Sequence, residues 1–231
     1  MTITSQTPTR IDLAGGTLDI WPLYLFHENS QTLNFAINCY ARCWLTPRRD
    51  KIIEFISRDL NRRERFSSLE ALKEAKKFHL PLPARLALAF AANRPFAKPI
   101  LSGMKKQIPR LAAPSTALGT WLARDDSEGL GMTAMGKNAG FTLETDSGVP
   151  AGSGLGGSSA LNIAICGALN RFTGKKLPSL KLIEMARNVE AQVLRVPTGE
   201  QDYYSAVFGG IQAIRLMPEG VRSEKLAVNA R

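Results

Sequence analysis

The stretch "PAGSGLGGSSA", residues 150–160, decides the fold because it places four glycines and three serines directly before an apolar run. A flexible linker would lead into a polar boundary. Here "SSALNIAICGALNRF" (158–172) follows, and its composition predicts a buried helix that ends near Gly174. The stretch is therefore a loop that leads straight into a core helix.

Two familiar nucleotide motifs fit this loop poorly. The spacing Gly152-x-Gly154-x-x-Gly157 matches a dinucleotide fingerprint, but the acidic residue expected about 20 positions later is replaced by basic "GKKLPS" (174–179). A Walker loop needs a lysine before Ser158, where this chain has glycine. A phosphate cradle remains, because glycines admit close backbone approach and a helix starting at Ser158 directs free amides toward an anion.

The composition bounds the class of protein. With 231 residues and 44% hydrophobic side chains, the chain can build one large domain or two small ones. It shows no signal-peptide pattern and no apolar run of about 18 residues, so we expect no membrane partner. Cys39, Cys43 and Cys166 lack metal-type spacing, which favours buried, reduced thiols in a cytoplasmic protein. With only His27 and His79, a zinc cluster or a histidine relay is not expected.

The positive charge is concentrated in one block. Residues 42–110 carry a net charge of +11, whereas the rest of the chain carries −1. Such a block is typical of a solvated basic insertion, of a nucleic-acid surface, or of a surface that attracts ATP or a sugar phosphate. Aromatic residues are sparse there and no motif that reads RNA or DNA occurs, so nucleic acid is not an expected partner.

The periodicity predicts strands and helices in a mixed order. The predicted strands are 3–14 (in short segments broken at Pro8), 31–45, 51–57, 141–145, 209–218 and 223–229. The predicted helices begin at Ser67–Ser68, at Ala84, at Ser158 and at Ser179, the last stopped by Pro197 and Gly199. The segment 95–139 is rich in loops.

Three motifs carry a family resemblance. "VPAGSGLGGSSALNIA" (149–164) resembles the central ATP-binding motif of the GHMP kinases, which include galactokinase, homoserine kinase, mevalonate kinase and phosphomevalonate kinase. "TPTRIDLAGGTLDIWPLY" (7–24) resembles their N-terminal substrate motif, in the form found in the sugar-kinase branch. "EAQVLRVPTGEQDYYSAVFGG" (190–210) resembles a later segment of the family. Because the motifs occur in the expected order, the chain is identified as a member, most similar to heptose-phosphate or fucose kinases.

The resemblance implies a fold. It is an α+β, two-layer, ribosomal-protein-S5-like N-terminal lobe over residues 1–215, with a basic insertion at about 46–138. Residues 216–231 would then start a truncated C-terminal lobe, because nothing there resembles the family's glycine-rich motif near the C-terminus. A fragment, a frameshifted product and one half of a split enzyme with a separate C-terminal half all fit this pattern.

The resemblance also implies a reaction. This is ATP- and magnesium-dependent phosphoryl transfer to a hydroxyl of a sugar or sugar phosphate, with Asp202 accepting the hydroxyl proton and Arg10 pairing with Asp202 and the γ-phosphate. The alternatives are a mevalonate-pathway kinase and an inactive nucleotide-binding remnant.

The same resemblance assigns the remaining site residues. Magnesium would be held by Glu190 and by Ser158 or its neighbour Ser159. The ATP loop would comprise Pro150, Gly152, Gly154, Leu155, Gly156, Gly157, Ser158, Ser159 and Ala160. The substrate would contact Asp19, Gly15, Gly16 and Tyr203, the last standing where sugar kinases usually have glutamine.

Overall fold

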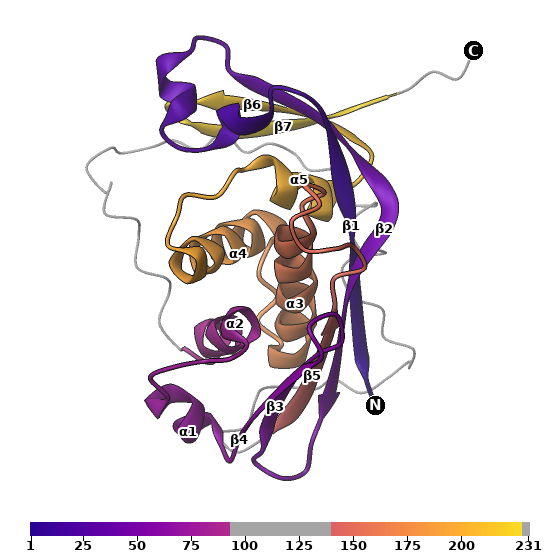
Figure 1. The fold of residues 1–231 in the computed structure, drawn as a ribbon, viewed down its shortest axis with the longest axis vertical. Coiled ribbons are helices and arrows are strands. Elements are labelled where there is room, and N and C mark those ends of the chain that lie inside the picture. The colour runs from indigo at the N-terminus through magenta and orange to yellow at the C-terminus, as the bar shows by residue number, and fades with distance from the viewer. Residues whose placement is uncertain (93–139, 228–231) are drawn as a thin grey trace.

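The computed structural model describes residues 1–92 and 140–227 (Figure 1). In this part of the chain the strands are β1 (Ile3–Ala14), β2 (Gln31–Pro47), β3 (Ile53–Ser57), β4 (Arg62–Phe66), β5 (Phe141–Asp146), β6 (Ile211–Met217) and β7 (Gly220–Leu226). The α-helices are α1 (Leu69–Glu74), α2 (Pro81–Ala91), α3 (Gly157–Thr173), α4 (Ser179–Leu194) and α5 (Gln201–Phe208). Two short 3-10 helices, η1 (Gly16–Asp19) and η2 (Leu23–Phe26), lie between β1 and β2.

The long strand β2 organises a single sheet. One edge of β2 pairs with β1 along most of its length. The other edge serves two branches: residues 42–47 pair with β5, which leads on to β3 and β4, while residues 31–35 pair with β6, which leads on to β7. Strands β3 and β5 run parallel, and the other described pairs are antiparallel. The two branches lie at opposite ends of the molecule in Figure 1.

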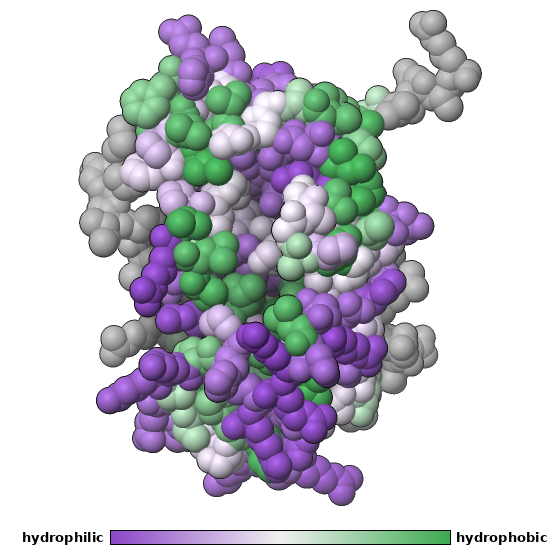
Figure 2. Space-filling model, in the orientation of Figure 1, coloured by the Kyte–Doolittle hydropathy of each residue, from purple (hydrophilic) through white to green (hydrophobic). Residues whose placement is uncertain are grey.

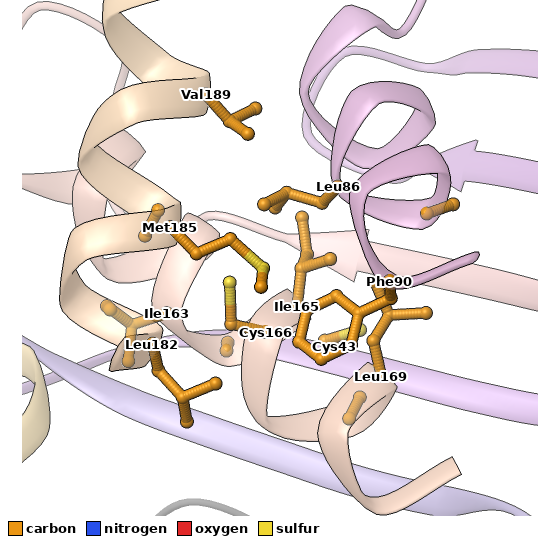
Figure 3. Packing of buried hydrophobic residues seen from close by; sticks show 14 of the residues in the cluster. Cys43, Leu86, Phe90, Ile163, Ile165, Cys166, Leu169, Leu182, Met185 and Val189 are labelled. Carbon is orange, nitrogen blue, oxygen red and sulfur yellow. The ribbon is translucent and has the colours of Figure 1, made fainter. Parts of the chain in front are cut away.

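The helices form the second layer. Helix α3 lies against β1 and β2 and is flanked by α2, α4 and α5. Its apolar face packs with side chains of β2, α2 and α4 in the cluster drawn in Figure 3, which includes Cys43, Phe90, Ile165, Cys166 and Met185. This arrangement is the predicted α+β fold in two layers. Cys43 and Cys166 are buried as expected, but Cys39 is exposed.

Several predicted elements differ from the observed ones. The first strand is continuous through Pro8, because proline is tolerated on an edge strand, and only a register shift marks the position between Pro8 and Arg10. Helix α1 ends early, at Glu74, and α4 ends at Leu194 with Arg195 in the left-handed region, before Pro197. Strand β4 and helix α5 were not predicted at all.

The basic block contributes to the sheet where it is described. Its residues 53–66 form β3 and β4, and several of its arginines are paired, for example Arg48 with Asp50 and Arg58 with Glu144. Figure 2 shows hydrophilic side chains gathered over this lower end of the molecule. Strand β7 pairs with β6 in the same sheet, and the proposed lobe boundary at residue 215 stays a prediction. The predicted loop segment 95–139 lies outside the described residues. Within residues 1–92 and 140–227, no helix is long and apolar enough to cross a bilayer.

Candidate functional site

The glycine loop connects the end of β5 to the start of α3. Gly152, Gly154 and Gly156 have φ angles of +76°, +73° and +69°, in the left-handed region that favours glycine. A Cβ atom added to Gly152 or Gly154 would meet no atom of the described residues within 4 Å, so these residues leave the space in front of the loop open. Helix α3 has no side chain that caps its N-terminus. The loop and the first turn of α3 therefore have the backbone geometry that an anion cradle needs, and the binding of phosphate there stays a prediction.

Arg10 of β1 joins this loop to helix α5. Its Nε and Nη2 both lie 2.6 Å from Oδ1 of Asp202, in the first turn of α5. Its Nη1 donates to the carbonyl oxygen of Gly154 at 3.0 Å, and its backbone N–H donates to that of Leu155 at 3.0 Å. The predicted pair of Arg10 and Asp202 is therefore formed, and Arg10 also holds the glycine loop by two backbone contacts.

The Asp202 carboxylate lies against the loop and is largely buried. A Cβ atom on Gly156 would approach its Cγ to 3.1 Å. Burial raises the pKa of Asp202, and the negative charges of Glu190 and Asp12 act in the same direction, while Arg10 opposes them. Asp202 is thus a carboxylate with increased proton affinity, held by one cation at the edge of the cradle.

Glu190 of α4 is buried, with 3% of its surface exposed, and its carboxylate is held by three donors. Its Oε2 accepts hydrogen bonds from Ser159 Oγ at 3.0 Å, Asn162 Nδ2 at 2.8 Å and the Tyr203 hydroxyl at 2.7 Å. Glu190 was predicted to hold magnesium together with Ser158 or its neighbour Ser159, and the serine whose hydroxyl contacts it is Ser159. Ser158 is exposed at the start of α3, at the mouth of the cradle.

Two residues that were predicted to contact substrate or ATP, Tyr203 and Ala160, have side chains buried in the interior. Tyr203 was expected to shape the substrate pocket, but its side chain is 0% exposed because it faces Glu190 between the helices. Ala160 was expected at the ATP loop. Its side chain is buried in the core and its N–H donates to Gly156 within the helix, so neither group is available to a phosphate.

Asp19 lies beside the site but under the segment that precedes α5. It is 2% exposed and accepts a hydrogen bond from the Gln201 N–H at 2.8 Å. Burial and, to a smaller extent, the charge of Asp202 raise its pKa to about 6, against the opposing effect of that hydrogen bond. A Cβ atom on Gly199 would come within 2.4 Å of its Oδ2, so only glycine fits there.

The glycine pair before Asp19 shapes the turn. Gly15 has φ +83°, and a Cβ atom there would lie 2.1 Å from the carbonyl oxygen of Gln31. A Cβ atom on Gly16 would lie 2.7 Å from Oδ2 of Asp12. The two glycines therefore let the chain after β1 pass close to β2 and to Asp12, and their predicted contact with substrate stays a prediction.

Sequence reasoning missed Asn162 and Asp12. The only signal for Asn162 was a polar side chain within the apolar run of α3. Asp12 stands two residues after Arg10, so both side chains lie on the same side of the strand, and its charge acts on Asp202.

The donor set at the cradle suits magnesium bound together with a nucleotide. Among the described residues no group of three or more His, Cys, Asp or Glu side chains could hold a metal alone. Magnesium is commonly bound by one or two protein oxygens together with substrate phosphates. The Ser158 hydroxyl and the Glu190 carboxylate supply hard oxygen ligands of this type beside the loop, so these residues fit the ion.

Comparison with known proteins defines the class. Residues 124–210 match the family model for the GHMP kinases N terminal domain. The chain is 30% identical over 209 residues to D-glycero-alpha-D-manno-heptose 7-phosphate kinase of Campylobacter jejuni, a match that covers 90% of this chain and 49% of the relative. It is 26% identical over 216 residues to L-fucokinase/L-fucose-1-P guanylyltransferase of Bacteroides fragilis, covering 91% of this chain and 20% of the relative.

The fold agrees with this match. The crystal structure of a D-glycero-D-manno-heptose 1-phosphate kinase from Bacteroides thetaiotaomicron superposes with a TM-score of 0.65 at 22% identity, over 99% of this chain and 61% of that one. Residues 124–210 thus match the N-terminal domain of the GHMP kinases, and the chain as a whole shares the fold of that kinase structure. The chain spans about half the length or less of the curated relatives described above.

Proposed function

We propose that this chain provides the ATP-binding and catalytic groups for phosphoryl transfer to a hydroxyl of a sugar or sugar phosphate. One observation carries the proposal. The Arg10–Asp202 ion pair lies directly against a glycine loop whose open side has room for a phosphate chain. A nucleophile-activating carboxylate and an anion cradle at one place are what phosphoryl transfer requires.

The proposed roles follow from the positions of the groups. The free amides of the first turn of α3 bind the phosphates of ATP, and the Arg10 guanidinium adds positive charge at the same edge. Asp202 accepts the proton of the substrate hydroxyl as its oxygen attacks the γ-phosphorus and the bond to ADP breaks. Arg10 keeps Asp202 ionised before this step, because a neighbouring cation favours the charged carboxylate.

Magnesium, when bound, would neutralise charge on the β- and γ-phosphates. We assign its protein ligands to Ser158 and Glu190. Glu190 can act as a magnesium ligand because the three donors described above all bind Oε2. Within the described residues no such donor binds Oε1.

A sugar or sugar phosphate is the proposed acceptor. The curated relatives named above act on heptose phosphate and fucose by their names. Asp19 is the proposed group for a substrate hydroxyl, since it lies close enough to Asp202 and Arg10 for their charges to affect its pKa. The basic block offers positive charge that would attract a phosphorylated substrate.

The test is ADP release over a panel of sugars and sugar phosphates. We expect magnesium-dependent ADP release with at least one heptose, fucose or galactose derivative, and none from Asp202→Asn. The assay is run on this chain and on the chain extended to the length of its relatives. Absence of turnover in both forms, with every sugar, would refute the kinase proposal.

A second candidate is a nucleotide-binding remnant or one half of a split kinase. One observation that fits it is the exposure of apolar side chains on η2 and on the segment before it, where Trp21 is 54% and Phe26 76% exposed. This candidate predicts nucleotide binding without turnover in this chain, and turnover once a C-terminal half is supplied.

A further inference from the structure

Glu190 is the point where three helices meet through one carboxylate oxygen. Its own helix is α4, Ser159 and Asn162 belong to α3, and Tyr203 belongs to α5. Tyr203 directly follows Asp202, and Ser159 lies in the first turn of α3. The carboxylate is therefore fixed relative to both halves of the proposed active site, the cradle and the catalytic aspartate.

Two of the three donors have no surface through which they could meet a ligand. Tyr203 and Asn162 are both 0% exposed. Among residues 1–92 and 140–227 the buried Asn162 amide oxygen has no hydrogen-bond partner, so the bond to Glu190 is the side-chain polar contact that accounts for this residue in the interior. The orientation of the amide follows from its chemistry, since only the nitrogen can donate to a carboxylate.

We infer that Asn162 and Tyr203 are positioning residues that hold Glu190 for magnesium. By occupying Oε2, they fix the rotamer of a buried side chain and leave Oε1 as its remaining ligand oxygen. The inference rests on the proposed function, in which Glu190 is a magnesium ligand. It also gives Tyr203, the residue that departs from the sugar-kinase pattern, a role in metal affinity rather than in sugar choice.

Partners that orient a metal ligand commonly change metal affinity 10- to 100-fold when they are removed. A purely structural contact between helices would instead lower thermal stability and leave the magnesium dependence of binding unchanged. The two roles therefore differ in a measurable quantity other than turnover.

The experiment titrates magnesium against binding of a fluorescent ADP analogue to the whole chain. We expect the magnesium concentration for half-maximal binding to rise about 10-fold or more in Tyr203→Phe, with metal-free nucleotide binding unchanged. Tyr204→Phe is the matched control, because Tyr204 is the next residue on α5, is 7% exposed and has no hydrogen bond to Glu190. Asn162→Leu serves as a second variant that removes another donor at similar side-chain volume.

The outcomes separate this inference from the proposed function. Equal magnesium dependence in the wild type, Tyr203→Phe and Asn162→Leu would overturn the positioning role alone. A wild-type chain that binds the analogue equally with and without magnesium would overturn the assignment of Glu190 and this inference with it. A tenfold shift in either variant, absent from Tyr204→Phe, would support it.

Discussion

The two ends of helix α3 are built in opposite ways. At its C-terminus, Gly174 closes the helix in the left-handed conformation with its N–H bonded to the carbonyl of Arg171, and Phe172 packs edge-on against Phe141 with ring centroids 5.4 Å apart. At its N-terminus, Gly156 is also left-handed, but no side chain caps the helix and its neighbours are Asp202, Arg10 and Glu190.

The C-terminal end of α3 stabilises the fold, whereas the N-terminal end carries the groups proposed for catalysis. Buried apolar packing stabilises the C-terminal end, where loss of a large side chain leaves a cavity. At the N-terminal end, uncapped amides and desolvated carboxylates lower stability, and a bound anion would satisfy them. Substitutions at the two ends should therefore affect different measurements.

The largest effect is expected for Asp202→Asn at the N-terminal end. The amide cannot accept the hydroxyl proton, so turnover should fall about 10³- to 10⁴-fold while nucleotide binding stays close to that of the wild type. Single-turnover ADP release and equilibrium nucleotide binding measure the two quantities. Turnover at the wild-type rate would remove Asp202 from the mechanism.

Phe172→Ala tests the C-terminal end. Removing a ring that is 2% exposed should lower the free energy of unfolding by about 3–4 kcal/mol, because the cavity beside Phe141 cannot collapse fully. Urea unfolding measures this loss. Nucleotide affinity per folded molecule should not change, and a large change in affinity would contradict the separation of the two ends.

The variants Gly154→Val and Gly174→Val compare the two ends of α3 directly. Both glycines have positive φ, +73° and +66°, so each valine should cost about 1–2 kcal/mol of backbone strain. Only the valine at 154 enters the space in front of the loop, so it alone should weaken nucleotide binding, by about 10- to 100-fold. Equal affinity in the two variants would refute the cradle.

The smallest effect is expected for Asp19→Asn. Since burial raises the pKa of Asp19 from 3.8 to about 6, the folded state binds the proton more tightly and stability falls as the pH rises between these values. Asparagine removes this dependence and should raise the free energy of unfolding at pH 7.5 by about 1–2 kcal/mol. Urea midpoints at pH 4.5 and pH 7.5 measure it. A difference between variant and wild type that is the same at both pH values would contradict the raised pKa.

Local signals predicted much of this architecture. Ser68 caps α1 through a hydrogen bond from the Ala71 N–H, and Gly174 ends α3, both as the sequence indicates. Strand β4, "RRERF", was missed because charged residues fill an edge strand that needs no apolar alternation. The strand through Pro8 was predicted as broken because its place at the sheet edge depends on distant pairing with β2.

The site was predictable in its members but not in their orientation. Asp202 and Tyr203 are adjacent, yet successive residues on a helix point about 100° apart, so one faces the loop and the other the interior. Which residue faces which side depends on how α5 packs between β1 and α3, and no local pattern encodes that. For the same reason the sequence left open which of Ser158 and Ser159 acts with Glu190, and the structure shows the contact with Ser159.

Strand β2 also links the two segments that carry the candidate site. The glycine loop follows a strand paired to one half of β2, whereas α5 precedes a strand paired to the other half. Arg10 and Asp202 are separated by 192 positions, so their ion pair depends on the long-range packing of α5 against β1. A nucleotide that binds only when these distant segments are packed together would therefore stabilise the whole described fold against unfolding.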